Sequence, residues 1–544
     1  MKKNNELCNF DGYVPHEFIK DHFPYEKPRN LQLETTSKIY DAIEDGYKYI
    51  FLEAASGFGK SAIAITLSDI YSSGKTYILT TTHQLASQYL EEFEEYDLKK
   101  VEPRSNFPCL TKRNGSYCAI GSCKWSKCKY HPESRRYNGR YTCNFISQLE
   151  DGLNSSTVIT TYSYFLSENF YSNGEFDEKY SNDFPKRNLV ICDEGHNIDD
   201  KIAERVKLTV SFNDLKDLGI NIKKELRELE YSDDYDFLLQ KIRTKYRKEL
   251  ERKKPGSPSY VKTFMKLNKI NKFLEHIGIN KNNIAYSEDE TAIYFYPVIT
   301  SNFTKESLFN TGNVFLFMSS SFFDYSSFAN DLGIEKDEIY ILRVPNIFDL
   351  SKNPVKIYKK HNMDYKNLSE YAEPSLEIIK EILDKHPNEK GIIHTVSTEC
   401  MEYIKKNLNN SRLICHTTAN RKEILDQFKN SNEPKVLVSP SMNEGVDLPG
   451  DLCRFQIIYK LPYYALSERV KLRSKTYKSG EDWYDYKMLT KLIQTYGRGI
   501  RFEGDYCKTY ILDNRILGII EKDLQGDELI PKYFIESMEV EKDK

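Results

Sequence analysis

The chain has 544 residues, enough for about three or four domains of about 150 residues each, and its 39% hydrophobic and 29% charged residues are typical of a globular protein. No run of about 18 apolar residues is present and residues 1–6 contain no apolar signal core, so we expect a cytoplasmic protein with no membrane partner. The formal net charge of −3 decides neither for nor against nucleic acid, and a polyanion would have to be bound by local basic patches.

The first motif is a glycine-rich stretch at residues 53–61, Glu-Ala-Ala-Ser-Gly-Phe-Gly-Lys-Ser, between a short apolar run and a helix-forming one. A strand, a glycine loop and a helix in this order predict a phosphate-binding loop, because glycines let backbone N–H groups approach an anion closely. Lys60 is expected to reach the β- and γ-phosphates and Ser61 to hold Mg²⁺. Ala54 stands where the common pattern has its first glycine. The expected nucleotide contacts are Ser56, Gly57, Phe58, Gly59, Lys60 and Ser61.

Two polar segments near this loop are further candidates for binding. Residues 23–32 contain two prolines and a polar tip, and the amide of Gln32 could pair with the N6 and N7 edges of adenine, although an ordinary helix start is the alternative interpretation. Residues 80–84, Thr-Thr-Thr-His-Gln, follow a strand-like run, where they would contact backbone phosphates or a neighbouring lobe, or would only cap the next helix.

Residues 104–143 interrupt the alternation of strands and helices with a cluster of cysteines. The five cysteines of this window are Cys109, Cys118, Cys123, Cys128 and Cys143. Cations and aromatic residues are interleaved with them, which suits the phosphates and bases of a single-stranded nucleic acid. Zinc prefers paired short spacings, so the irregular spacing favours a [4Fe-4S] cluster over zinc, with unliganded thiols as the third interpretation.

Residues 188–196 read as a buried strand that ends in Asp-Glu-Gly-His. Two carboxylates at this position match the requirements of nucleoside triphosphate hydrolysis: Asp193 would hold Mg²⁺ through water, and Glu194 would orient and deprotonate the attacking water. His196 would transmit the nucleotide state to a second lobe.

A helical insertion is predicted between residues 201 and 288. Its first helix has apolar residues at a spacing of four, Leu238, Ile242, Tyr246 and Leu250, flanked by several lysines and arginines, and a second helix is predicted over 261–277. The basic face of the first helix would follow a nucleic acid strand or would be a solvated surface.

The second half of the chain repeats the α/β pattern after a connecting segment at residues 343–353. Five strand candidates, at residues 391–395, 411–416, 436–439, 455–459 and 508–512, predict a second parallel sheet without a phosphate loop of its own. Arg498 and Arg501, three residues apart in the segment 494–501, would share one face and reach a γ-phosphate from across a cleft.

The ordered set of motifs resembles that of the XPD/DinG family of iron-sulfur superfamily 2 DNA helicases. The matching segments are residues 54–61, 193–196, 317–321, 444–447 and 494–501, with the cysteine window and the helical insertion between them. The resemblance covers nearly the whole chain. It implies an α/β fold of two RecA-like parallel-sheet lobes of the P-loop NTPase type, closing on ATP, with an iron-sulfur domain and a helical arch inserted in the first lobe. It also implies 5′→3′ translocation on single-stranded DNA.

The resemblance assigns roles to individual residues. Lys60 and Ser61 would bind phosphate and Mg²⁺, Asp193 and Glu194 would act on Mg²⁺ and water, and Arg498 and Arg501 would be arginine fingers. In the same way it assigns nucleotide-site or coupling positions to Glu444, Gly445, Asp447 and Gln494. Cys109, Cys128 and Cys143 match the first, third and fourth cluster ligands, while Cys123 and Cys118 compete for the second, for which we choose Cys123.

The implied domains are the first lobe in three parts (1–103, 148–203 and 293–345), the iron-sulfur domain (104–147), the arch (204–292) and the second lobe (346–544). Two positions depart from the family pattern. Gly195 replaces the usual alanine, and Ser320-Ser321 replaces the usual Ala-Thr. Both changes keep the hydrogen-bonding groups, so we expect activity to be retained.

The sequence therefore predicts a monomeric ATP-dependent 5′→3′ DNA helicase that uses ATP, Mg²⁺ and a [4Fe-4S] cluster to unwind duplex DNA, acting in DNA repair. Its expected partners are single-stranded and forked DNA, with repair or transcription proteins beside them. The alternative is a single-stranded DNA translocase or clamp subunit with little unwinding activity.

Overall fold

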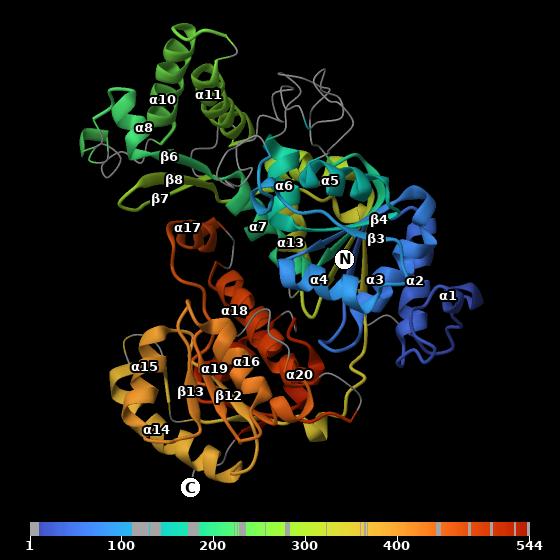
Figure 1. Cartoon of the computed structure of the whole chain (residues 1–544). Helices are drawn as coiled ribbons and strands as arrows, with labels where there is room; N and C mark the ends of the chain where they lie inside the picture. Colours follow the sequence, from blue (N-terminus) through green and yellow to red (C-terminus); the bar gives the residue numbers. More distant parts are fainter. Residues whose placement is uncertain are drawn as a thin grey trace.

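The structure is a computed structural model of the chain, and it consists of two lobes with a helical hairpin projecting from the first (Figure 1). It describes residues 10–110, 130, 143–171, 184–221, 223–225, 227, 235–255, 257–277, 283–322, 324–359, 361–363, 366, 368–441, 448–476, 480–500, 504–526 and 529–540. Among these, no helix is both long enough and apolar enough to span a bilayer.

The first lobe is built on a seven-stranded parallel sheet with the order β10-β1-β9-β5-β2-β4-β3. Its strands are β1 (Tyr49–Glu53), β2 (Thr76–Thr80), β3 (Leu98–Lys100), β4 (Thr157–Thr161), β5 (Arg187–Asp193), β9 (Gly312–Ser319) and β10 (Ile339–Arg343). The central strands are buried along nearly their whole length because helices cover both faces of the sheet, which explains their continuous apolar runs.

The helices of the first lobe follow or precede these strands. They are α1 (Glu17–Asp21), α2 (Gln32–Glu44), α3 (Lys60–Ile70), α4 (His83–Glu92), α5 (Asn144–Asn154), α6 (Tyr162–Tyr171), α7 (Ile198–Val206), α12 (Ser301–Ser307) and α13 (Tyr325–Leu332). In this arrangement the phosphate loop and the acidic pair both follow the carboxyl ends of parallel strands, and so they lie at the same edge of the sheet.

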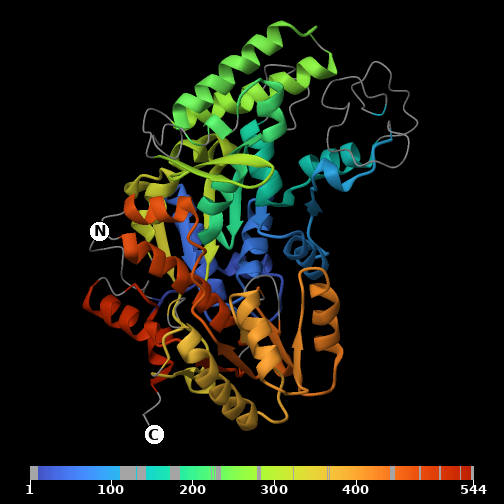
Figure 2. The same ribbon diagram turned by 90° about the vertical axis from the view of Figure 1, so that its left-hand side faces the viewer.

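The insertion contains a helical hairpin and a small sheet. Its elements are β6 (Leu208–Ser211), α8 (Phe212–Asp217), α10 (Tyr235–Glu251), α11 (Pro258–Ile277), β7 (Ile284–Glu288) and β8 (Ala292–Pro297). Both predicted helices are present, but the three-stranded antiparallel sheet β6-β8-β7 was not predicted. The hairpin stands at the end of the molecule opposite the second lobe (Figure 2).

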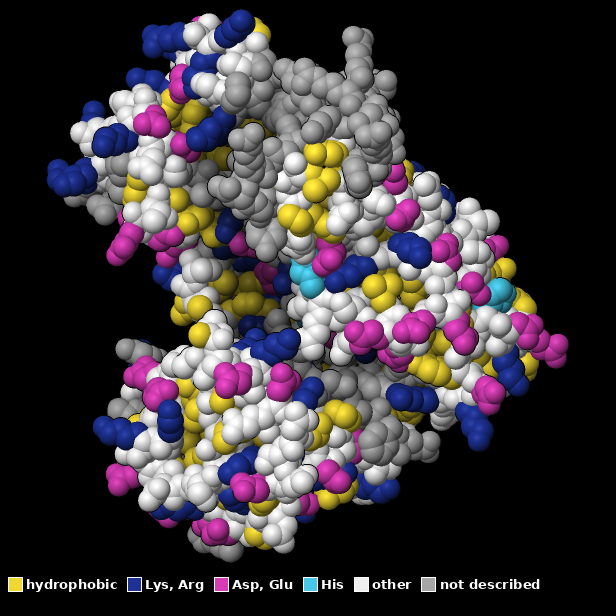
Figure 3. Space-filling model, viewed as in Figure 1, with side chains coloured by type: hydrophobic (Ala, Val, Ile, Leu, Met, Phe, Trp, Pro, Cys, Tyr) yellow, Lys and Arg dark blue, Asp and Glu magenta, His cyan; other side chains and the backbone are white. Residues whose placement is uncertain are grey.

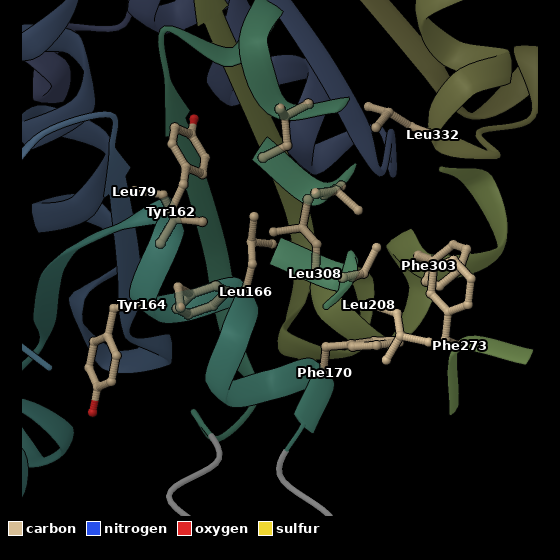
Figure 4. Packing of buried hydrophobic residues seen from close by; sticks show 14 of the residues in the cluster. Leu79, Tyr162, Tyr164, Leu166, Phe170, Leu208, Phe273, Phe303, Leu308 and Leu332 are labelled. Carbon is tan, nitrogen blue, oxygen red and sulfur yellow. The ribbon is translucent and has the colours of Figure 1, made fainter. Parts of the chain in front are cut away.

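The core of the first lobe continues into this insertion. Phe170 of α6 lies next to Leu208 of β6, and Phe303 of α12 contacts both Phe170 and Phe273 of α11, with ring centroids 5.6 and 5.9 Å apart (Figure 4). Because these aromatic side chains are fully buried, the base of the hairpin is fixed to the lobe.

The second lobe has its own seven-stranded parallel sheet, in the order β13-β14-β12-β15-β16-β11-β17. Its strands are β11 (Val355–Ile357), β12 (Gly391–His394), β13 (Leu413–Cys415), β14 (Val436–Ser439), β15 (Phe455–Ile458), β16 (Lys508–Ile511) and β17 (Met538–Val540). Its helices are α14 (Leu368–Lys385), α15 (Thr398–Asn407), α16 (Arg421–Asn430), α17 (Glu468–Thr476), α18 (Gly480–Tyr496), α19 (Arg515–Gln525) and α20 (Lys532–Glu536). The two-lobed fold predicted from the sequence is confirmed, and the second sheet has two strands that were not predicted, β11 and, at the edge of the sheet, β17.

An interlobe ion cluster joins the two lobes. It comprises three carboxylates of the first lobe and three cations of the second: Asp199, Asp200, Asp331, Arg469, Arg473 and Lys487. The Nζ of Lys487 lies 3.0 Å from Asp199 and 3.2 Å from Asp200. Arg473 is fully buried, binds Asp331, and lies 3.3 Å from Asp199. Since the charges balance, the burial of each ion is offset by a partner from the other lobe.

We expect Arg473→Met to destabilise the protein by about 3–5 kcal/mol, because the buried Asp331 would lose its cation. The measurement is a urea titration in a Trp125→Phe background, followed by the fluorescence of Trp483, whose ring lies 5.1 Å from the Arg473 guanidinium carbon. Lys471→Met on the same helix is the matched control, because Lys471 is exposed and pairs with Glu468 on the surface. Equal effects of the two substitutions would contradict a structural role for the buried cluster.

Candidate functional site

A cleft of about 710 Å³ lies between the lobes at the carboxyl edge of the first sheet. The first lobe lines it with the phosphate loop, the turn after β2 and the acidic pair after β5. The second lobe contributes Gln494, near the end of α18, and Arg498, just beyond it. The cleft thus brings together most of the described residues that the sequence analysis assigned to a nucleotide site.

The glycine loop has the backbone geometry that the sequence predicted. Gly57 and Gly59 have φ angles of 79° and 92°, in the left-handed region that favours glycine. A Cβ on Gly59 would also lie 2.2 Å from the Nε2 of Gln32, so the loop leaves no space for a side chain there. Phe58 is buried beneath the loop and can serve a ligand only through its backbone.

Gln32 supports this loop from behind. Its Nε2 donates to the carbonyl of Phe58 at 2.7 Å, its Oε1 accepts from the backbone N–H of Arg29 at 2.6 Å, and the side chain is buried. Arg29 in turn donates to the carbonyl of Gly57. The adenine contact expected for Gln32 stays a prediction, and it would require the amide to exchange these partners.

Lys60 begins helix α3 and spans the loop. Its Nζ donates to the carbonyl of Ala54 at 2.8 Å and to that of Ala55 at 3.3 Å. Ser61 follows in the first turn and lines the cleft. A positive helix N-terminus, a lysine and a hydroxyl fit the charge of a triphosphate with its Mg²⁺.

The two carboxylates after β5 differ in environment. Asp193 is buried, and its Oδ2 accepts from the Tyr89 hydroxyl at 3.1 Å. Burial and the neighbouring Glu194 raise the pKa of Asp193 to about 6, against the opposing effect of Lys60. A divalent cation would offset this repulsion, so the donor set fits Mg²⁺.

Glu194 is connected to the second lobe through Gln494. The Nε2 of Gln494 donates to Glu194 Oε2 at 3.0 Å and to His196 Nε2 at 2.8 Å, while His196 Nδ1 lies 2.9 Å from the Ser319 hydroxyl. These contacts fit a His196 that carries its proton on Nδ1. Glu194 has a φ of 52°, a strained conformation for a residue with a side chain.

Two glycines allow close contacts around this connection. A Cβ on Gly497, directly after α18, would lie 2.6 Å from the Cβ of Ser56 in the phosphate loop, so the loop packs against the second lobe. A Cβ on Gly195 would lie 3.1 Å from the Cβ of Phe317 and 3.3 Å from its Cα. This tight contact explains glycine at the position where the family has alanine.

Some predicted site residues lie outside the described residues. These are Arg501, Glu444, Gly445, Asp447, Cys118, Cys123 and Cys128. Conversely, two contacts of Asp193 were not predicted: the Tyr89 hydroxyl donates to its side chain, and the Tyr162 hydroxyl donates to its carbonyl at 2.8 Å. Neither tyrosine lies in a motif that would give a sequence signal of this role.

The two ends of the cysteine window come together. Cys109 and Cys143 are both buried, and the rings of Phe107 and Phe145, each two residues away from one of these cysteines, lie 5.9 Å apart. This geometry fits Cys109 and Cys143 as two ligands of one group. Within the described ranges, no set of three or more ligating side chains is assembled.

A second cleft, of about 1040 Å³, adjoins the nucleotide cleft. Thr81, Thr82 and Gln84, in the turn after β2 and the start of α4, line both. The second lobe lines it with basic and aromatic side chains, namely Arg421, Lys422, Lys429, Lys491, Tyr463 and Tyr464. Cations next to aromatic rings suit a nucleic acid strand.

Comparisons with known proteins agree with this geometry. A family model described as "Type III restriction enzyme, res subunit" matches residues 26–221, and one described as "Helicase C-terminal domain" matches residues 379–526. A probable ATP-dependent helicase of Methanocaldococcus jannaschii is 22% identical over 93% of this chain and 94% of its own length. The ATP-dependent DNA helicase YoaA of Escherichia coli is 20% identical over the same shares.

Solved structures of XPD proteins have the same fold. A structure titled XPD helicase matches with a TM-score of 0.62 at 14% identity, covering 95% of this chain and 100% of that one. Xpd4 of S. tokodaii matches with a TM-score of 0.56 at 16% identity, covering 94% and 100%. The chain is therefore similar over most of its length to proteins named as ATP-dependent helicases, and it has the two-lobed fold of the XPD structures.

Proposed function

We propose that the protein is an ATP-dependent DNA helicase that moves 5′→3′ along single-stranded DNA and unwinds duplex DNA. The observation that carries this proposal is the composite site, in which Gln494 of the second lobe is hydrogen-bonded to Glu194 and His196 of the first. An ATPase that needs no relative movement of two lobes would not require this contact. The adjoining basic cleft has the charge to hold the DNA strand along which the lobes would move.

In hydrolysis, the glycine loop and Lys60 hold the phosphates, and Ser61 and Asp193 hold the metal. Mg²⁺ supplies charge neutralisation, and ATP supplies the phosphoryl group that is transferred to water. Glu194 orients the attacking water and accepts its proton, while Arg498 and Arg501 stabilise the charge that develops on the phosphate.

Coupling to DNA runs through the same residues. Gln494 contacts Glu194 directly, so a change at the γ-phosphate alters the hydrogen bond that holds α18. The turn at Thr81 and Thr82 transmits the change to the strand cleft, since both residues line the two clefts. Glu444, Gly445 and Asp447 complete this coupling from the second lobe.

We further propose that Cys109, Cys123, Cys128 and Cys143 hold a [4Fe-4S] cluster, with Cys118 as the competitor for the second position. The convergence of Phe107 and Phe145 supports a shared group at the base of this domain. Such a cluster supplies a covalent cross-link for a segment that is rich in cysteine and poor in apolar residues. The protein acts as a monomer in DNA repair, with a strand clamp of low unwinding activity as the alternative function.

For hydrolysis, we expect Lys60→Ala and Glu194→Gln each to lower the DNA-stimulated turnover of ATP by about 10²–10⁴-fold, since each removes a group that acts in the transition state. Phosphate release measured with and without single-stranded DNA tests this. Lys99→Ala, an exposed lysine of the same lobe, is the control and should retain full turnover. Wild-type turnover in Glu194→Gln would refute its assignment as the base.

For polarity, a duplex with a 5′ single-stranded tail should be unwound in the presence of ATP, and one with a 3′ tail should not. Strand displacement on both substrates measures this, with Glu194→Gln as the inactive control. Equal unwinding of the two substrates would refute the polarity. ATP hydrolysis and movement on DNA without strand separation would support the translocase instead.

For the cluster, we expect Cys109→Ser and Cys143→Ser to remove iron, inorganic sulfide and the visible absorbance of the purified protein. Cys415→Ser, a half-buried cysteine of the second lobe, should leave all three unchanged. Cys118→Ser and Cys123→Ser, compared singly, identify the second ligand by which of them loses iron. Zinc in place of iron in the wild-type protein would refute the assignment.

A further inference from the structure

The hairpin formed by α10 and α11 has a charge of opposite sign to that of the chain. Residues 235–277 contain twelve lysines and arginines against four aspartates and glutamates, a net charge of +8 in a protein whose net charge is −3. Dark blue side chains gather over the upper end of this hairpin in Figure 3. A solvated surface of ordinary composition mixes both signs, so this segregation calls for an explanation.

Four lysines of the hairpin have acidic partners. Lys241 pairs with Glu225, Lys253 with Glu249, Lys266 with Asp214 and Lys272 with Glu306. These four lysines are half-buried or buried. Their charges are used within the protein and are not available to a partner.

The outer cations differ. Lys245, Lys248 and Arg252 are exposed and follow one another at intervals of three and four residues on α10, which places them on one side of the helix. We call these three residues the basic stripe. Across the described part of the chain, none of the three has an acidic side chain within ion-pair distance. Lys254, in the turn of the hairpin, and Lys262, in the first part of α11, are exposed as well.

The basic stripe is held on a rigid support. The opposite side of α10 buries Leu239, Ile242 and Tyr246 in the core that continues into the first lobe. Phe273 of α11 fixes the hairpin to Phe303 of α12, as Figure 4 shows. The backbone of α10 is therefore fixed, and the three cations stay close together. A polyanion bound along the stripe would reduce their mutual repulsion.

We propose that the basic stripe binds the phosphodiester backbone of DNA outside the two interlobe clefts, a proposal that rests on the proposed function. The chemistry recognised is a row of phosphates, independent of base sequence, because the three contacts are side-chain cations. The stripe lies on the projecting hairpin, away from the second lobe (Figures 1 and 2). It would therefore hold DNA beyond the part of the strand that lies between the lobes.

The test is the salt dependence of DNA affinity for the triple variant Lys245→Gln, Lys248→Gln and Arg252→Gln. Loss of three phosphate contacts should reduce the slope of log K against log salt by about 2.7 on duplex DNA or about 2.1 on a single strand, and weaken binding at low salt by about tenfold or more. Fluorescence anisotropy with a blunt duplex, a single strand and a tailed duplex identifies which part of the substrate is bound.

Two further triple variants isolate the effect of charge at this position. The first, which combines Lys245→Arg, Lys248→Arg and Arg252→Lys, keeps the three positive charges and should keep the wild-type slope. The second, which combines Lys336→Gln, Lys385→Gln and Lys406→Gln, removes three charges from exposed positions elsewhere and should leave the slope unchanged. Urea unfolding of the stripe variant verifies that it folds as the wild type does.

The outcomes separate this inference from the proposed function. If the wild-type protein binds no DNA, the proposed function itself fails. If the wild-type protein binds DNA and the stripe variant keeps the wild-type slope on all three substrates, only the role of the stripe is overturned. An equal loss of slope in the Lys336, Lys385 and Lys406 variant would also overturn it, because the effect would then be one of net charge.

Discussion

Helix α18 of the second lobe is held against the segment that follows β5, and the geometry of the site depends on this contact. Lys487 is ion-paired with Asp199 and Asp200, and Gln494, about two turns further along the helix, is hydrogen-bonded to Glu194 and His196. The carboxylate assigned to water activation and those that dock the second lobe thus lie within one short segment. A movement of α18 relative to the first lobe must change the surroundings of Glu194.

The same segment shows how local charge decides the state of a buried carboxylate. Burial and Glu194 raise the pKa of Asp193 to about 6, and the opposing effect of Lys60, whose Nζ is hydrogen-bonded to the loop carbonyls, does not cancel them. Burial would also raise the pKa of Asp200, but Lys487, Arg469 and Arg473 lower it well below its ordinary value. Asp193 therefore still needs a cation such as a metal ion, while the charge of Asp200 is already neutralised by cations of the second lobe.

The local motifs were predictable because they depend on neighbours in the sequence. The left-handed glycines at 57 and 59, the start of α3 at Lys60 and the strand that ends at Asp193 follow from short-range rules. The strands β11 and β17, at one side of the second sheet, and the antiparallel sheet of the insertion were not predicted. The strands β11 and β17 have three residues each, and they acquire their conformation by pairing with distant segments.

By itself, the sequence determined the two α/β halves, the order of the motifs and the chemistry of the phosphate loop and the acidic pair. Only the tertiary structure decided that Gln32 supports the loop, that Tyr89 contacts Asp193, and that Gln494 meets Glu194 and His196. Each of these contacts joins residues far apart in the chain, and its geometry is set by how sheets and helices pack. Side-chain type restricts what a residue can bind, but packing selects which partner it has.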